Sequence, residues 1–179
     1  MPATHIALLR GINVGTAKRV PMADLRDLCA GLGYTGVATL LNSGNVVFTA
    51  RRENPAKAET RIEEAIQARF GFSSRVTVIT ADELNAIVQE NSLRDAATDP
   101  ARLLVAFLKT AGHRARLEPL AGRNWKPGLF ALGGRAAYLW CPDGMLESPL
   151  AAEVTRVLAD SVTTRNWATV LKLQALAAR

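Results

Sequence analysis

The stretch Ile6-Ala7-Leu8-Leu9-Arg10-Gly11-Ile12-Asn13-Val14-Gly15 passes from an apolar run into a turn that combines glycine with asparagine. The same combination recurs at Asn42-Ser43-Gly44-Asn45, between two further apolar runs. Glycine and asparagine adopt positive φ more easily than other residues, so both stretches predict tight turns between regular elements. Backbone N–H groups in such turns can point at a ligand, which makes both turns candidate binding elements.

The spacing of apolar residues around these turns predicts alternating strands and helices. Leu25, Leu28 and Cys29 share one helical face, and Gly71 ends a second helical pattern. The elements expected in the first half are strands at 5–10, 37–41, 46–50 and 75–80 and helices at 22–32 and 56–70. Their order is that of a split βαβ, ferredoxin-like unit.

The second half nearly repeats this order with an unrelated sequence. Strands are expected at 103–109, 129–132 and 136–140, and helices at about 80–90, 113–120, 150–158 and 166–178. Thr163 or Thr164 is expected to cap the last helix, which would place Arg165 in its first turn. We therefore expect an α+β protein with two ferredoxin-like lobes, residues 1–80 and 81–179, packed as one compact unit, with the second lobe incomplete or irregular.

The composition is that of a globular protein, with 179 residues of which 49% are apolar and 21% are charged. No apolar run approaches the roughly 18 residues of a membrane-spanning helix, and the start of the chain lacks a signal-peptide pattern. We expect a soluble, cytoplasmic protein with no membrane partner. The two cysteines, Cys29 and Cys141, have no CxxC spacing or nearby histidine, so free thiols and no metal site are expected. We also expect no cofactor.

The net charge of +6 favours anionic partners, and the excess is concentrated in one segment. Residues 102–126 contain six Lys or Arg residues against Glu118 alone. This segment supports a second hypothesis, nucleic-acid binding. A solvated basic rim is the open alternative, because aromatic residues do not alternate with these charges as a base-stacking platform would require.

Several of these stretches, taken together, resemble the bacterial domain of unknown function 1697 family. The resemblance spans almost the whole chain and rests on residues 6–15, 22–25, 43–48, 163–167 and 170–173. It implies a cytoplasmic α+β protein with ferredoxin-like elements and no established activity. The resemblance therefore supports a fold more than a function.

The chain departs from the family pattern at several positions. Thr16 stands where a second glycine is common, and Leu40 stands where an aromatic residue is common. Glu147 and Pro149 flank Ser148 at positions that are often basic in the family. Any anion site in this chain must then depend on other segments.

Our first functional hypothesis is the binding of a small anionic, phosphate-bearing ligand. Arg10 and Arg165 would neutralise the anion, while polar turn residues and glycine backbones would orient it; Lys18 and Arg19 precede a helix whose positive end attracts anions. The candidate ligand-binding residues are Arg10, Gly11, Asn13, Gly15, Ser43, Gly44, Asn45, Arg165 and Asn166. The open alternative is that both turns are purely conformational and that Arg165 pairs with an acidic residue.

The sequence names no reaction. It contains no HExxH or GxSxG motif, and His5 and His113 have no motif partner. The Arg10–Gly15 loop is neither a Walker loop nor a GxGxxG loop, because Gly11 and Gly15 are its only glycines. A third hypothesis, a non-catalytic protein-interaction or dimerisation module, rests on the apolar C-terminal segment 167–176, although Trp167 is expected to belong to the core.

Overall fold

The structure is a computed structural model that describes residues 1–179. The chain divides into two compact units, of which the first comprises Met1–Leu84 and Leu173–Arg179 and the second comprises Asn85–Lys172. The divisions fall within helix α3 (Ala81–Glu90) and within helix α6 (Trp167–Ala177). No helix combines the length and the apolar character that crossing a membrane requires.

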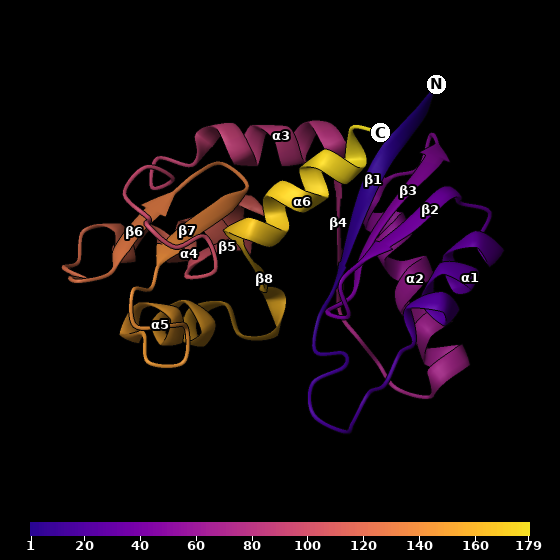
Figure 1. The fold of residues 1–179 in the computed structure, drawn as a ribbon, viewed down its shortest axis with the longest axis horizontal. Coiled ribbons are helices and arrows are strands. Elements are labelled where there is room, and N and C mark those ends of the chain that lie inside the picture. The colour runs from indigo at the N-terminus through magenta and orange to yellow at the C-terminus, as the bar shows by residue number, and fades with distance from the viewer. The chain divides into compact units, whose positions relative to one another are not determined.

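The first unit has the expected strand and helix order. Its elements are β1 (Pro2–Leu9), α1 (Met22–Gly31), β2 (Thr35–Leu40), β3 (Asn45–Arg51), α2 (Pro55–Phe70) and β4 (Val76–Thr80). The strands form an antiparallel sheet in the order β2-β3-β1-β4, and α1 and α2 pack together on one face of it (Figure 1). Leu8 lies opposite Asn45 and Leu9 lies opposite Val76, so β1 ends where β3 and β4 begin.

Local sequence signals explain why α2 begins and ends where it does. The Asn54 side chain accepts a hydrogen bond from Ala56 N–H at 2.9 Å, and Pro55 occupies the first helical position. Gly71 ends the helix with φ 77°, a conformation that glycine adopts without strain. The buried face carries Ile62 and Ile66, which join the core beneath the sheet.

The second unit has the same strand order as the first. It contains the second half of α3 and the elements β5 (Leu103–Phe107), α4 (Ala111–Ala121), β6 (Leu129–Leu132), β7 (Ala136–Trp140), α5 (Pro149–Leu158) and β8 (Thr163–Asn166). Its antiparallel sheet runs β6-β7-β5-β8. The expected α+β fold with two ferredoxin-like lobes is confirmed, and the second lobe is more regular than expected because β8 supplies its fourth strand.

The end of the second unit corrects one expectation from the sequence. Arg165 lies in β8 opposite Val105 and not in the first turn of the last helix. Asn166 provides the helix cap, since its Oδ1 accepts from Thr169 N–H at 2.9 Å. β-branched Thr163 and Thr164 suit an extended strand, and asparagine is the stronger helix cap.

Both central strands of the second sheet are buried along their whole length, which explains their continuous apolar sequence. Side chains of α4 and α5 share one core with this sheet, including Leu117 and Leu150. On the other face, the Tyr138 hydroxyl donates to the Ile87 carbonyl in α3 at 2.6 Å. The sheet therefore offers no open strand face like that of a single-layer nucleic-acid platform at these positions.

Candidate functional site

The first unit brings the two glycine- and asparagine-containing turns together. Leu9 N–H donates to the Gly44 carbonyl at 2.8 Å, and Asn13 Nδ2 donates to the Asn42 carbonyl at 2.8 Å. The turn after β1 and the turn between β2 and β3 are thus joined by hydrogen bonds between residues far apart in the sequence.

The glycines of these turns serve two different purposes. Gly44 has φ 85°, and a Cβ atom there would lie 2.7 Å from Leu9 Cβ and 2.8 Å from Ile12 Cδ1. Gly11 and Gly15 have φ 70° and 63°, but a Cβ on either would meet nothing within 4 Å. Gly44 is therefore required for close packing, whereas Gly11 and Gly15 supply only the left-handed backbone conformation.

The side chains of Asn13 and Asn45 hold the two turns in shape. Asn13 has φ 55°; its Oδ1 accepts from Val20 N–H at 2.8 Å, and its Nδ2 also donates to the Val20 carbonyl at 2.9 Å. The fully buried Asn45 donates from Nδ2 to the Leu40 carbonyl at 2.8 Å and to Ser43 Oγ at 3.0 Å. Both amide groups have protein partners, and direct ligand contact by them stays a prediction.

Beside the turns, α1 begins without a capping side chain. Pro21 occupies the cap position and offers no side-chain acceptor, and the first backbone bond of the helix runs from Leu25 N–H to the Pro21 carbonyl at 3.0 Å. The N–H groups of residues 22–24 therefore lie before the first intrahelical bond. A cavity of about 210 Å³ lies there, lined by Asn13, Asn42 and residues 19–22.

Basic residues border this cavity, and one of them holds the loop before α1 by a hydrogen bond. Arg19 is exposed and lines the cavity, and Lys18 donates from Nζ to the Ser73 carbonyl at 3.3 Å. The Arg10 backbone is held just before β4, because its N–H donates to the carbonyl of Arg75, the residue that precedes this strand, at 2.9 Å. Arg19 was not among the nine candidates from the sequence, although its place just before a helix was a usable signal.

Arg165 and Asn166 belong to the second unit. Arg165 is half-buried, and its Nη1 donates to the Thr164 carbonyl at 3.0 Å. Burial lowers the pKa of Arg165 to about 10, so the guanidinium remains protonated at neutral pH. A role for these two residues in an anion site remains a prediction.

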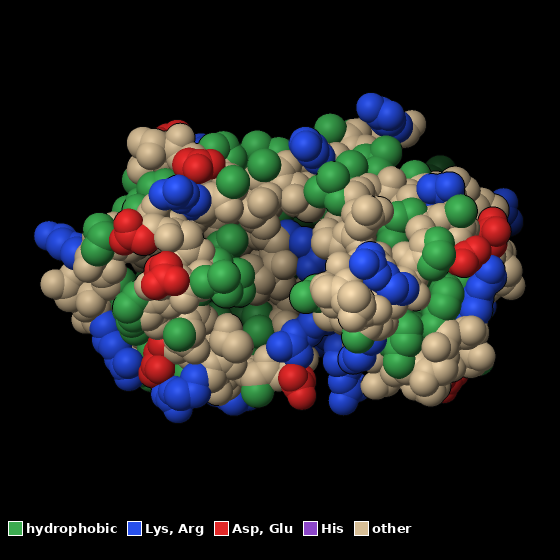
Figure 2. All heavy atoms as spheres, turned by 60° about the horizontal axis from the view of Figure 1, so that its bottom comes forward, with side chains coloured by type: hydrophobic (Ala, Val, Ile, Leu, Met, Phe, Trp, Pro, Cys, Tyr) green, Lys and Arg blue, Asp and Glu red, His purple; other side chains and the backbone are tan.

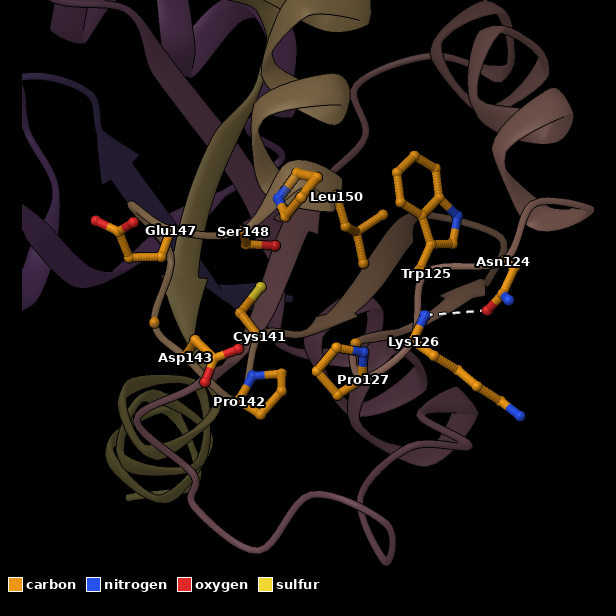
Figure 3. A pocket seen from close by; sticks show the side chains of 13 residues that line it. Asn124, Trp125, Lys126, Pro127, Cys141, Pro142, Asp143, Glu147, Ser148 and Leu150 are labelled. Carbon is orange, nitrogen blue, oxygen red and sulfur yellow. Dashed lines mark hydrogen bonds between the residues drawn. The ribbon is translucent and has the colours of Figure 1, made fainter.

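The second unit contains a larger pocket of about 420 Å³ (Figure 3). It lies between the loop at 124–128, the turn at 141–144 and the start of α5. Its apolar side chains include Trp125, Pro127, Pro142 and Leu150 (Figure 3). No local sequence pattern predicts this pocket, because its walls come from segments that only the tertiary fold brings together.

The cations of the basic segment 102–126 largely have partners within the second unit. Arg102, Arg114 and Arg123 form ion pairs with Asp99, Glu118 and Glu153. Arg116 donates to the Val157 carbonyl. Basic side chains are prominent on the face drawn in Figure 2, yet nucleic-acid binding by this segment remains only a prediction.

One of these ion pairs predicts acid sensitivity. Hydrogen bonds from Arg156 and Arg123 lower the pKa of Glu153 from 4.5 to about 2. A carboxylate with a depressed pKa stabilises the fold above its unfolded pKa, and this contribution is lost as the pH falls through the folded value. We expect the difference in melting temperature between the native protein and Glu153→Gln to shrink between pH 4.5 and 2.

Thermal unfolding followed by circular dichroism across this pH range measures that difference. Glu64→Gln, at an exposed position on α2, is the matched control and should show a small, nearly constant difference. A Glu153→Gln difference that stays constant over the range would contradict the ion-pair account.

The cysteines are two buried thiols with no disulfide between them. Burial raises the pKa of Cys29 to about 12, and it also raises the pKa of Cys141. Neither thiol is therefore a ready thiolate nucleophile at neutral pH. No group of three or more His, Cys, Asp or Glu side chains is arranged to hold a metal ion.

Comparison with known proteins establishes the family. A family model described as "Protein of unknown function (DUF1697)" matches residues 3–138. The chain belongs to this family. The resemblance inferred from the sequence motifs is thereby confirmed, and the matched range includes both turns, α1 and the pocket loop at 124–128.

A solved structure supports the fold over the full length. The conserved bacterial protein SP0830 from Streptococcus pneumoniae is similar with a TM-score of 0.80 and 21% sequence identity, covering 99% of each chain. At this level of identity the likeness concerns the fold alone. No curated protein matches the chain.

Proposed function

We propose that the first unit binds a small phosphate-bearing ligand at the start of α1. The observation that carries this proposal is an uncapped helix N-terminus that meets a cavity bordered by Arg19. In the bound state, N–H groups of Met22, Ala23 and Asp24 would donate to phosphate oxygens while Arg19 neutralises charge.

The charges around the helix start favour an anion. Asp24 is the acidic residue of the first turn, and it is already paired with Arg69 at 3.2 Å. Lys18 and Arg19 add two positive charges immediately before the helix. The positive end of the helix dipole acts in the same direction.

The size of the cavity limits the ligand. Its volume of about 210 Å³ is below the roughly 300–1,000 Å³ of pockets that enclose drug-sized molecules. A phosphoryl group fits this scale, and the remainder of a larger metabolite would lie outside. Within the proposal, Asn13, Ser43, Gly44 and Asn45 act by holding the turns, and Gly11 and Gly15 permit the loop conformation.

The start of α5 gives an internal contrast. There Ser148 Oγ accepts from Ala151 N–H at 3.1 Å, and Pro149 has no N–H group. That helix start has its own cap, whereas α1 has none. Arg10, Arg165 and Asn166 remain candidate contacts for the part of the ligand beyond the phosphate.

The test compares two substitutions that each remove one positive charge from the first unit. Inorganic phosphate is expected to raise the melting temperature of the native protein in a saturable manner, as any ligand that binds only the folded state does. Arg19→Ala should weaken the phosphate affinity about tenfold or more, because a charge-assisted contact contributes about 1.5–3 kcal/mol.

Lys57→Ala is the matched control, because Lys57 is exposed on α2 and lies outside the cavity lining. It should leave the phosphate affinity almost unchanged. Circular dichroism checks that both variants fold. Equal affinities in the two variants, or no stabilisation of the native protein by phosphate, would overturn the proposal.

A further inference from the structure

We infer that the second unit carries a separate site for a small amphipathic cation, meaning an ammonium or guanidinium group attached to an apolar body. The site is the pocket between Trp125 and the turn that contains Asp143 (Figure 3). This inference does not depend on the anion site proposed for the first unit, because it uses different residues and ligand chemistry.

The interior of the pocket suits an apolar body. Trp125, Pro127, Pro142 and Leu150 surround it, and its volume of about 420 Å³ falls within the roughly 300–1,000 Å³ of small-molecule sites. The Trp125 indole N–H donates to the Leu120 carbonyl at 2.8 Å. That bond fixes the ring and uses its one donor, so the indole offers the ligand apolar surface. Arg123 already lies over the ring, with its guanidinium carbon 5.9 Å from the ring centroid.

The loops that form the pocket are held by backbone contacts. A Cβ at Gly128 would lie 2.9 Å from the Trp140 carbonyl oxygen and 3.0 Å from the Trp125 carbonyl oxygen, so the loop packs directly against β7. Across the pocket, Gly144 N–H donates to the Cys141 carbonyl at 2.9 Å and closes the turn. A cavity formed in this way is largely prepared before a ligand enters, which lowers the ordering cost of binding.

The charges at the rim favour a cation. The carboxylates of Asp143 and Glu147 are exposed and form no ion pair. Arg102 also reaches this turn, because it donates to the Pro142 carbonyl, but it is paired with Asp99, and Arg123 is paired with Glu153. Lys126 is the one cationic side chain of the lining, and it extends away from the apolar interior (Figure 3). The lining of this pocket is thus acidic on a chain whose net charge is +6.

Two further features favour a cation over an anion. The capped start of α5, where Ser148 bonds to Ala151 N–H and Pro149 lacks an N–H group, offers few donors to an anion. An ammonium or guanidinium group is also attracted to the face of a tryptophan ring. Arg123 already makes such a contact with Trp125, so a ligand cation would use the other face of the ring. Asp143 lies beside Cys141 and Pro142, at the edge of the interior, and Glu147 lies farther out, beyond Ser148 (Figure 3).

The experiment uses three probes of similar shape and different charge. The full-length protein is titrated with 2-phenylethylamine, 2-phenylethanol and 3-phenylpropionate, and the indole N–H signal of Trp125 is followed by NMR. We expect saturable binding of the amine, about tenfold weaker binding of the alcohol, and still weaker binding of the carboxylate. Equal binding of all three, or no shift of Trp125 with any of them, would overturn the inference.

Substitution of Asp143 separates charge recognition from general apolar affinity. Asp143→Asn retains a residue that turns favour, and it should reduce the amine affinity to about that of the alcohol while leaving alcohol binding unchanged. Asp95→Asn is the control, because Asp95 is exposed in the same unit and lies outside the pocket lining. An amine preference that survives Asp143→Asn would contradict the assignment of this carboxylate.

Each of the two proposed sites can be tested without the other. Arg19→Ala should leave amine binding unchanged, and Asp143→Asn should leave phosphate binding unchanged. The backbone NMR spectrum of each variant shows whether the fold is retained, so that a lost signal is attributed to the site and not to unfolding.

Discussion

Replacing Gly44 with alanine is expected to lower the free energy of unfolding by about 3 kcal/mol. The left-handed backbone costs alanine about 1 kcal/mol, and overpacking a close contact adds about 1–3 kcal/mol. The contacts responsible are Leu9 Cβ at 2.7 Å and Ile12 Cδ1 at 2.8 Å from the added methyl group, at a backbone φ of 85°. Urea denaturation followed by circular dichroism measures the change.

Gly15→Ala is the control for this substitution. Gly15 also has a positive φ, 63°, but a Cβ there would meet nothing within 4 Å. Its cost should be that of the backbone conformation alone, about 1 kcal/mol. If Gly44→Ala costs no more than Gly15→Ala, the close packing of the two turns is contradicted.

Replacing Asn13 with alanine is expected to lower the free energy of unfolding by about 3 kcal/mol. The substitution removes three hydrogen bonds and leaves both backbone groups of the buried Val20 without their side-chain partner. An unsatisfied buried polar group costs about 1–3 kcal/mol, and the φ of 55° adds strain for alanine. Chemical denaturation again gives the value.

Asn13→Asp is the informative partner of this variant. Aspartate tolerates the left-handed conformation and keeps an acceptor for Val20 N–H, but it loses the donors to Val20 and Asn42. The free energy of unfolding of Asn13→Asp should lie between that of the native protein and that of Asn13→Ala. A cost within about 0.5 kcal/mol for Asn13→Ala, typical of neutral surface positions, would show that this side chain does not hold the turns together.

Most of the fold could be predicted from the sequence because its signals are local. Asn54-Pro55 and Gly71 mark the ends of α2, and the glycine-containing turns separate strands with continuous apolar patterns. The fourth strand of the second unit was missed because threonine is both a helix-capping and a strand-forming residue. The strand forms because Arg165 pairs with Val105, sixty positions earlier in the chain. No local pattern encodes that pairing.

The candidate site was predictable only in part, for a related reason. Glycine and asparagine identified the two turns, but the hydrogen bond from Asn13 to Asn42 gives the Asn13 side chain a role in joining them. The uncapped start of α1 beside Arg19 does have a local signal, because the proline at the cap position is visible in the sequence. The pocket at Trp125 and Asp143 had no local signal at all.

A phosphate titration monitored by ¹H–¹⁵N NMR shows whether the start of α1 binds an anion. We expect saturable shifts of the Met22, Ala23 and Asp24 amides with a common affinity, while the Ala151 amide, which Ser148 caps, stays unchanged. Shifts confined to the start of α5 or to the basic segment 102–126, with the three α1 amides unmoved, would contradict this expectation.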